Sequence, residues 1–303
     1  MSELRPRPGA SLLERAATVY DFEAAFRSRG AAPAVAPALP EAEAPSASPA
    51  PVAPPRPIAG RYAAIDRALL AEGQMLVPGA PVGMLAEEFR LAKRQLLLTA
   101  ADLRATKGER ARTILVASPN SHDGKTYCAI NLALSLAAER DTEVLLIDAD
   151  VAKPDVLARL GVADGPGLLD ALADPAIAIA DCIVATDVPQ LSLLPAGARS
   201  TQDTELLASG RTGALLDALL VADPRRIIVI DSPPALAASP AATLALHVGQ
   251  VMLVVRADRT SESELSEAVA LLDGCETIQL LLNAVSHAPG GRRFGSYYGM
   301  EDA

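Results

Sequence analysis

Short apolar runs separated by helical patterns fill the chain from residue 113 onward, and they constrain its fold more than any other feature. Consecutive aliphatic residues dominate each run, whereas a half-exposed strand would alternate apolar and polar residues. Such strands, with helices between them, are typical of a parallel sheet covered on both faces. The sequence therefore predicts an α/β fold with a doubly wound, mostly parallel sheet. The runs occupy residues 113–117, 143–147, 191–194, 226–230, 251–255 and 278–282.

Composition excludes several other classes of protein. Half of the 303 residues are hydrophobic, but aromatic residues make up only 3%, so Ala, Leu, Val and Ile must build the core. The formal net charge of −10 argues against a general basic surface, and we expect no nucleic-acid partner. Cys128, Cys182 and Cys275 have no paired spacing, so we expect neither a zinc site nor a disulfide framework. No apolar run approaches the roughly 20 residues of a membrane helix, and no secretory signal is expected, which predicts a cytoplasmic location.

Composition also divides the chain into five parts. Residues 1–30 contain a candidate amphipathic helix. Residues 31–60 hold nine of the 24 prolines and eleven alanines, which predicts a disordered linker. Residues 61–110 form a lead-in and a long helix that we interpret as an oligomerisation helix. We assign residues 111–288 to a nucleotide-binding domain and residues 289–303 to a flexible tail. The apolar face of the long helix, predicted over about 82–103, carries Leu85, Phe89, Ala92, Leu96 and Leu103.

A candidate phosphate-binding loop follows the first strand. Residues 118–126 read Ser-Pro-Asn-Ser-His-Asp-Gly-Lys-Thr, and a helix is predicted from Lys125 to about Glu139. Inward-facing backbone N–H groups and the start of a helix attract phosphate, Lys125 would reach the terminal phosphates, and Thr126 would bind Mg²⁺. Pro119 replaces the usual first Gly, and a lone Gly-Lys-Thr also occurs as a plain turn before a helix. The candidate nucleotide-binding residues are Ser121, His122, Asp123, Gly124, Lys125, Thr126 and Tyr127.

Carboxylates follow two further strands. Asp148 and Asp150 have the i, i+2 spacing that places two side chains on the same side of a strand. Such a pair can bind hydrated Mg²⁺ or accept a proton, although either Asp could also cap a helix. Asp231 follows four apolar residues and is a candidate Mg²⁺ ligand opposite the phosphate loop. Ligands of an open parallel sheet gather at the carboxyl ends of its strands, where all these residues are expected.

These motifs together resemble those of the bacterial tyrosine kinases, the BY-kinase family, which is similar to the MinD/ParA branch of P-loop NTPases. The resemblance covers about residues 80–300, and its strongest parts are residues 118–126, 145–154 and 227–231. Asn120 stands where MinD/ParA relatives have a signature Lys, which favours the kinase branch. His122 stands where the family usually has Gly.

The resemblance implies an ATP- and Mg²⁺-dependent protein-tyrosine autokinase of exopolysaccharide or capsule synthesis. It assigns catalysis to Lys125, Asp148 and Asp150, and metal binding to Thr126, Asp148 and Asp231. The adjacent Tyr297 and Tyr298 in the tail become the phosphoacceptors.

The resemblance also implies partners. The family joins subunits in a ring through an acidic-x-x-Arg-x-x-Arg helix, and here Glu87, Arg90 and Lys93 occupy those positions. It further implies a separate membrane-embedded polysaccharide co-polymerase as activator, which would bring the protein to the inner membrane.

Two other functions stay open at this level. A MinD/ParA-like ATPase switch would release free phosphate and report its state by dimerising. A non-catalytic nucleotide-binding regulator is suggested by Pro119, His122 and the small number of tail tyrosines.

Overall fold

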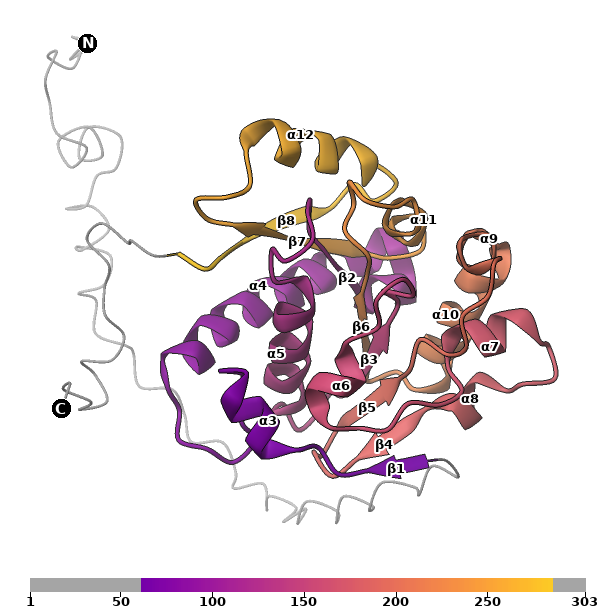
Figure 1. Cartoon of the computed structure of the whole chain (residues 1–303), viewed down its shortest axis with the longest axis horizontal. Helices are drawn as coiled ribbons and strands as arrows, with labels where there is room; N and C mark the ends of the chain where they lie inside the picture. The colour runs from indigo at the N-terminus through magenta and orange to yellow at the C-terminus, as the bar shows by residue number, and fades with distance from the viewer. Residues whose placement is uncertain (1–60, 286–303) are drawn as a thin grey trace, which may run out of the picture. The chain divides into compact units, whose positions relative to one another are not determined.

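The computed structural model describes residues 61–285 (Figure 1). The predicted N-terminal helix, the Pro/Ala-rich linker and the tail with Tyr297 and Tyr298 lie outside the described residues. Within the described part, no helix is both long and apolar enough to cross a lipid bilayer.

The described residues form one eight-stranded sheet with the order β1-β4-β5-β3-β6-β2-β7-β8. All neighbouring pairs are parallel except β4 and β5, which are antiparallel. The doubly wound, mostly parallel sheet predicted from the sequence is therefore confirmed. The strands are β1 (Arg61–Ala63), β2 (Thr113–Ala117), β3 (Glu143–Asp148), β4 (Val184–Thr186), β5 (Leu191–Leu194), β6 (Arg226–Asp231), β7 (Gln250–Arg256) and β8 (Ile278–Asn283).

The central strands are buried because their successive side chains enter two separate cores. In β2, Leu115 and Ala117 belong to one apolar cluster, whereas Ile114 and Val116 belong to the other. Strands β3 and β6 divide their residues in the same way. Because neither face meets water, these strands read as continuous apolar runs rather than as alternating ones.

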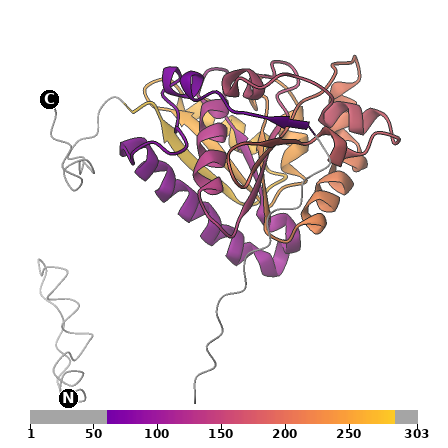
Figure 2. The same cartoon turned by 90° about the horizontal axis from the view of Figure 1, so that it is seen from below.

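Helices cover both faces of the sheet (Figures 1 and 2). One cluster contains side chains of α3 (Arg67–Glu72), α4 (Met84–Lys107), α5 (Lys125–Ala137) and α6 (Val156–Leu160). The other contains side chains of α7 (Leu168–Ala173), α8 (Ile179–Cys182), α9 (Asp203–Ala208), α10 (Gly210–Ala222), α11 (Pro240–Ala245) and α12 (Glu262–Leu271). A short 3₁₀ helix, η1 (Gly108–Arg112), joins α4 to β2.

Most predicted elements form within one or two residues of their expected bounds. The six apolar runs are β2, β3, β5, β6, β7 and β8, and α4 has its five expected apolar positions buried or half-buried. The sequence analysis did not find β1, at the edge of the sheet, and β4, next to it, which are three residues long and contain polar residues. The three cysteines are buried and free.

Candidate active site

The three central strands bring the candidate residues together at their carboxyl ends. Asp148, the last residue of β3, is the register partner of Asp231, the last residue of β6. Asp231 is also the register partner of Val116 in β2, which leads into the phosphate loop. Neighbouring strands lie about 4.8 Å apart, so the phosphate loop and both carboxylates share one edge of the sheet.

The phosphate loop contains two residues in the left-handed backbone region. Gly124 has a φ of 104°, and a Cβ atom there would lie 2.1 Å from Nδ2 of Asn283, so this position requires Gly. His122 has a φ of 68°, which shows that the residue replacing the family's Gly keeps a Gly-like backbone. Among the described residues, none accepts a hydrogen bond from the backbone N–H groups of 121–124. These free donors are the ones that an anion cradle needs.

Side chains from neighbouring strands hold the loop in this conformation. Nδ2 of Asn283 donates to the carbonyl of Asp123 at 2.9 Å, and a guanidinium nitrogen of Arg256 donates to the carbonyl of His122 at 2.8 Å. The Asp123 carboxylate is buried and accepts from the backbone N–H of Asn120 at 2.9 Å, so it organises the loop from within. Sequence reasoning missed Asn283 and Arg256. Both end apolar strands, the same signal that singled out Asp231.

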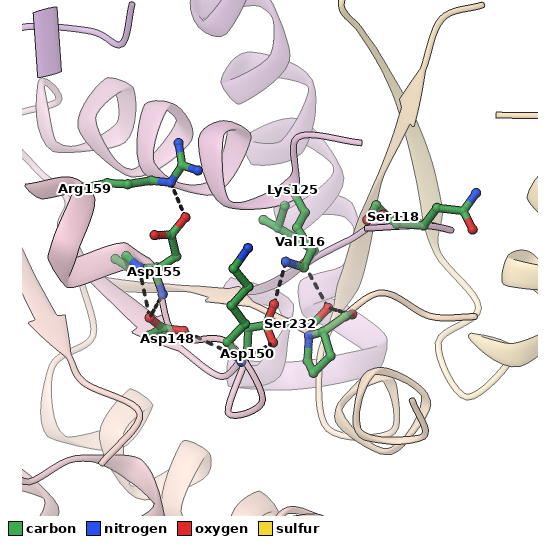
Figure 3. Close-up of polar contacts among 12 residues, drawn as sticks. Val116, Ser118, Lys125, Asp148, Asp150, Asp155, Arg159 and Ser232 are labelled. Atoms are coloured by element: carbon green, nitrogen blue, oxygen red, sulfur yellow. Dashed lines mark hydrogen bonds and ion pairs between the residues drawn. The ribbon is translucent and has the colours of Figure 1, made fainter. Parts of the chain in front are cut away.

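Lys125 and Asp150 form a nearly buried ion pair. Nζ of Lys125 lies 2.6 Å from Oδ2 of Asp150, and both side chains are largely shielded from water (Figure 3). Burial leaves each charge dependent on the other. The same ammonium group is the candidate partner of the nucleotide phosphates, so Asp150 holds it at the edge of the cradle.

Asp148 is held by backbone N–H groups. Its Oδ2 accepts from the backbone N–H groups of Asp155 and Val156 at 3.1 and 3.0 Å, and its Oδ1 accepts from that of Asp150 at 3.3 Å. Burial raises the pKa of Asp148 to about 6, although these N–H groups favour the carboxylate. Asp148 therefore supports the start of α6, the capping role that the sequence left open, and titrates near neutral pH.

Asp231 is a buried acidic residue at the end of β6. It is fully buried, and neither carboxylate oxygen has a hydrogen-bond partner among the described residues. Burial raises the pKa of Asp231 to about 8, against the opposing effects of the Lys125 ammonium and the nearby Thr126 hydroxyl. A buried carboxylate next to a hydroxyl fits a divalent cation, because oxygen ligands are those that Mg²⁺ prefers.

The other predicted nucleotide-binding residues lie around the loop. Ser121 and His122 are exposed, whereas Thr126 is buried at the start of α5. The hydroxyl of Tyr127 points away from the loop and donates to the carbonyl of Gln74 at 2.7 Å. Tyr127 also lines a mostly apolar cavity of about 460 Å³ between α4, α5 and the end of β8.

Comparisons with known proteins show the family of the chain. The AAA_31 family model, described as an AAA domain, matches residues 111–283. The crystal structure of the VpsO kinase domain is 31% identical with a TM-score of 0.54, and the match covers 67% of this chain and all of that domain. The chain belongs to the bacterial tyrosine kinase family.

Curated members of the kinase family match over similar spans. Tyrosine-protein kinase wzc of Salmonella typhi is 28% identical over 232 residues, which is 76% of this chain but 31% of that protein. The putative tyrosine-protein kinase CapB of Staphylococcus aureus is 27% identical over 198 residues, which is 65% of this chain and 82% of that protein. The chain thus spans less than a third of wzc. The shared domain is a nucleotide-binding domain of the P-loop type.

Proposed function

We propose that this protein is a tyrosine autokinase that transfers the γ-phosphoryl group of ATP to Tyr297 and Tyr298. The observation that carries the proposal is the convergence of the phosphate loop, Lys125 and three carboxylates at one sheet edge, in a chain of the kinase family. In the reaction the tyrosine oxygen forms a bond to the γ-phosphorus and the bond to the bridging oxygen of ADP breaks. The phenolic proton passes to a carboxylate.

Positioning and charge neutralisation would supply most of the catalysis. The free N–H groups of residues 121–124 and the Lys125 ammonium would hold the phosphates. Thr126 and Asp231 would hold Mg²⁺, with Asp148 beside them. Bound Mg²⁺ supplies charge neutralisation on the phosphate oxygens. When Lys125 turns to phosphate, the Asp150 carboxylate is released to position the metal or the acceptor.

Asp148 is the proposed proton acceptor because its pKa of about 6 lies close to neutral pH, where a general base works best. We expect Asp148→Asn to retain ATP binding and to lower phosphoryl transfer about 10²-fold or more. The Asn amide group cannot accept all three backbone N–H groups, so stability should also fall by about 1–3 kcal/mol.

The kinetics of this variant must therefore be measured at a temperature where it is folded. Asp155→Asn, which alters a half-exposed neighbouring carboxylate paired with Arg159, is the matched control. Near-normal phosphoryl transfer in folded Asp148→Asn, together with lower stability, would restrict Asp148 to its capping role.

The acceptor assignment rests on the tail tyrosines. We expect the double variant Tyr297→Phe/Tyr298→Phe to lose most autophosphorylation and to bind ATP normally, because the phosphate site lies on residues 118–231. Phosphopeptide mapping by mass spectrometry after incubation with MgATP measures the result. Tyr62→Phe is the control, since Tyr62 is 69% exposed on β1.

The same assay separates the other two functions. Full phosphorylation of the double variant would place the acceptor elsewhere, with Tyr20 and Tyr62 as candidates. Free phosphate without protein phosphorylation would identify an ATPase switch. Nucleotide binding without any turnover would identify a regulator.

The homo-oligomer that the resemblance implies would use α4. Met84, Leu91 and Leu98 are exposed at seven-residue spacing along this helix. Lys93, however, is buried, where its Nζ donates to the carbonyl of Ser135 at 2.9 Å and pairs with Glu139 at 2.6 Å. The second cation of the family motif therefore supports the packing of α4 on α5, so contacts between subunits would depend on the other positions.

The proposed membrane partner follows from the role in exopolysaccharide or capsule synthesis. We propose a separate membrane-embedded co-polymerase that recruits the kinase to the inner membrane and activates it. Adding the cytoplasmic part of such a protein to the purified kinase should raise tail phosphorylation, and an unchanged rate would contradict activation.

A further inference from the structure

A polar cavity of about 420 Å³ borders the phosphate loop on the side of β7 and α12. Three of its lining residues belong to the loop itself, two follow β6, and two lie in and before α12. The cavity therefore borders the loop that is proposed to hold the phosphates. Its lining residues are Asn120, Ser121, Asp123, Leu236, Ala237, Arg259 and Glu264.

Hydrogen bonds fix the walls of this cavity. One oxygen of Glu264 accepts from Nδ2 of Asn120 at 2.9 Å, and the other accepts from the backbone N–H and the hydroxyl of Ser261, each at 2.8 Å. On the opposite wall, the backbone N–H of Leu236 donates to the carbonyl of Pro119 at 3.1 Å. The residues that line the cavity therefore also help to hold the phosphate loop in place.

Arg259 is the side chain of this cavity that stays available for a ligand. It is exposed, and it forms no ion pair with any residue in the range 61–285. The neighbouring carboxylates are already engaged, since Glu264 has three donors and Asp123 accepts from the loop. The Arg259 charge helps to lower the pKa of Glu264, but the two side chains form no ion pair, so an anion that enters the cavity can approach the guanidinium.

We infer that this cavity binds the acceptor peptide, and that Arg259 selects an acidic residue three or four positions after the acceptor tyrosine. The inference rests on the proposed function and names the recognition chemistry of the same site. The chain's own C-terminus has this pattern, because Glu301 and Asp302 follow Tyr298 by three and four residues.

The dimensions agree with this arrangement. Three extended residues span about 10 Å, and a sphere of 420 Å³ is roughly 9 Å across. An acidic residue three or four positions after the acceptor tyrosine can therefore lie within the same cavity as the tyrosine. Catalysis needs the acceptor oxygen in line with the phosphate, so a charge contact at this distance improves the orientation of the acceptor.

A charge-exchange experiment tests the inference with the full-length protein. The peptide substrates are residues 290–303 with the natural sequence and the same peptide with Glu301→Lys and Asp302→Lys. We expect Arg259→Glu to lower kcat/KM for the natural peptide about tenfold and to prefer the lysine peptide. The wild type should show the opposite preference. Arg140→Glu, an exposed charge reversal in the α5–β3 connection at the other end of the sheet, is the matched control.

Two further measurements separate the possible failures. Affinity for a fluorescent ATP analogue should be the same in the wild type and Arg259→Glu, and a parallel loss would assign Arg259 to the nucleotide and overturn the inference. Equal use of both peptides by both proteins would also overturn it. If the wild type phosphorylates no tyrosine, the proposed kinase function fails. Fluorescence anisotropy of the two labelled peptides then still decides whether the charge exchange governs peptide binding.

Discussion

Replacing Lys125 with Met is expected to abolish phosphoryl transfer and to weaken MgATP binding by at least about tenfold. The ammonium is the one charged side chain at the start of α5 that can reach the cradle of free N–H groups. A hydrogen bond between charged partners contributes about 1.5–3 kcal/mol, which corresponds to roughly a 10- to 100-fold change in affinity. Titration with a fluorescent ATP analogue and phosphate mapping measure the two effects.

The ion pair with Asp150 complicates this variant in a way that the structure makes testable. Lys125→Met leaves the Asp150 carboxylate buried without its cation, and such a loss costs about 3–5 kcal/mol of stability. The double variant Lys125→Met/Asp150→Asn removes the uncompensated charge as well. It should regain most of the lost stability in urea unfolding without regaining activity.

The pair of variants therefore separates folding from function. If the double variant is both stable and active, Lys125 has no role at the phosphates. If the single variant binds ATP with normal affinity, the phosphate-loop assignment fails, whatever its stability.

The sequence was sufficient to predict the sheet and the edge where the candidate residues meet, because the strands that carry these residues are buried on both faces. Their apolar runs end in polar residues, and parallel strands bring these ends together. The partners of each side chain were not predictable in the same way. That Asp148 accepts backbone N–H groups while Asp150 holds Lys125 depends on the path of residues 149–155.

Lys93 shows the same limit on α4. The helical period placed Phe89 and Leu96 on the buried face, and both are buried. The period does not predict that the long Lys93 side chain reaches Glu139, just beyond the end of α5, because this contact joins segments that are far apart in the sequence. The burial of Lys93 therefore depends on a long-range contact, which the local pattern of α4 does not predict.

Asp231→Asn is expected to stabilise the metal-free protein while it abolishes phosphoryl transfer. Burial raises the pKa of Asp231 to about 8 in the folded protein, from its ordinary value of 3.8. The stability that the protonated group contributes is complete below the unfolded pKa and is lost as the pH rises through about 8. Asn does not ionise, so the variant escapes this loss.

The stability difference between Asp231→Asn and the wild type should therefore grow with pH. Each pH unit in this window changes it by at most about 1.4 kcal/mol, and we expect a difference at least about 2 kcal/mol larger at pH 8 than at pH 5. Urea unfolding of both proteins in the presence of a chelator measures this, with Asp273→Asn as an exposed control.

Added Mg²⁺ should stabilise the wild type alone, because a cation that binds the folded state shifts unfolding by mass action. A pH-independent difference would contradict the raised pKa of Asp231. Equal stabilisation of both proteins by Mg²⁺ would show that Asp231 is not the metal ligand. A more stable but inactive variant would show that the protein keeps this buried carboxylate at the expense of stability because the reaction needs it.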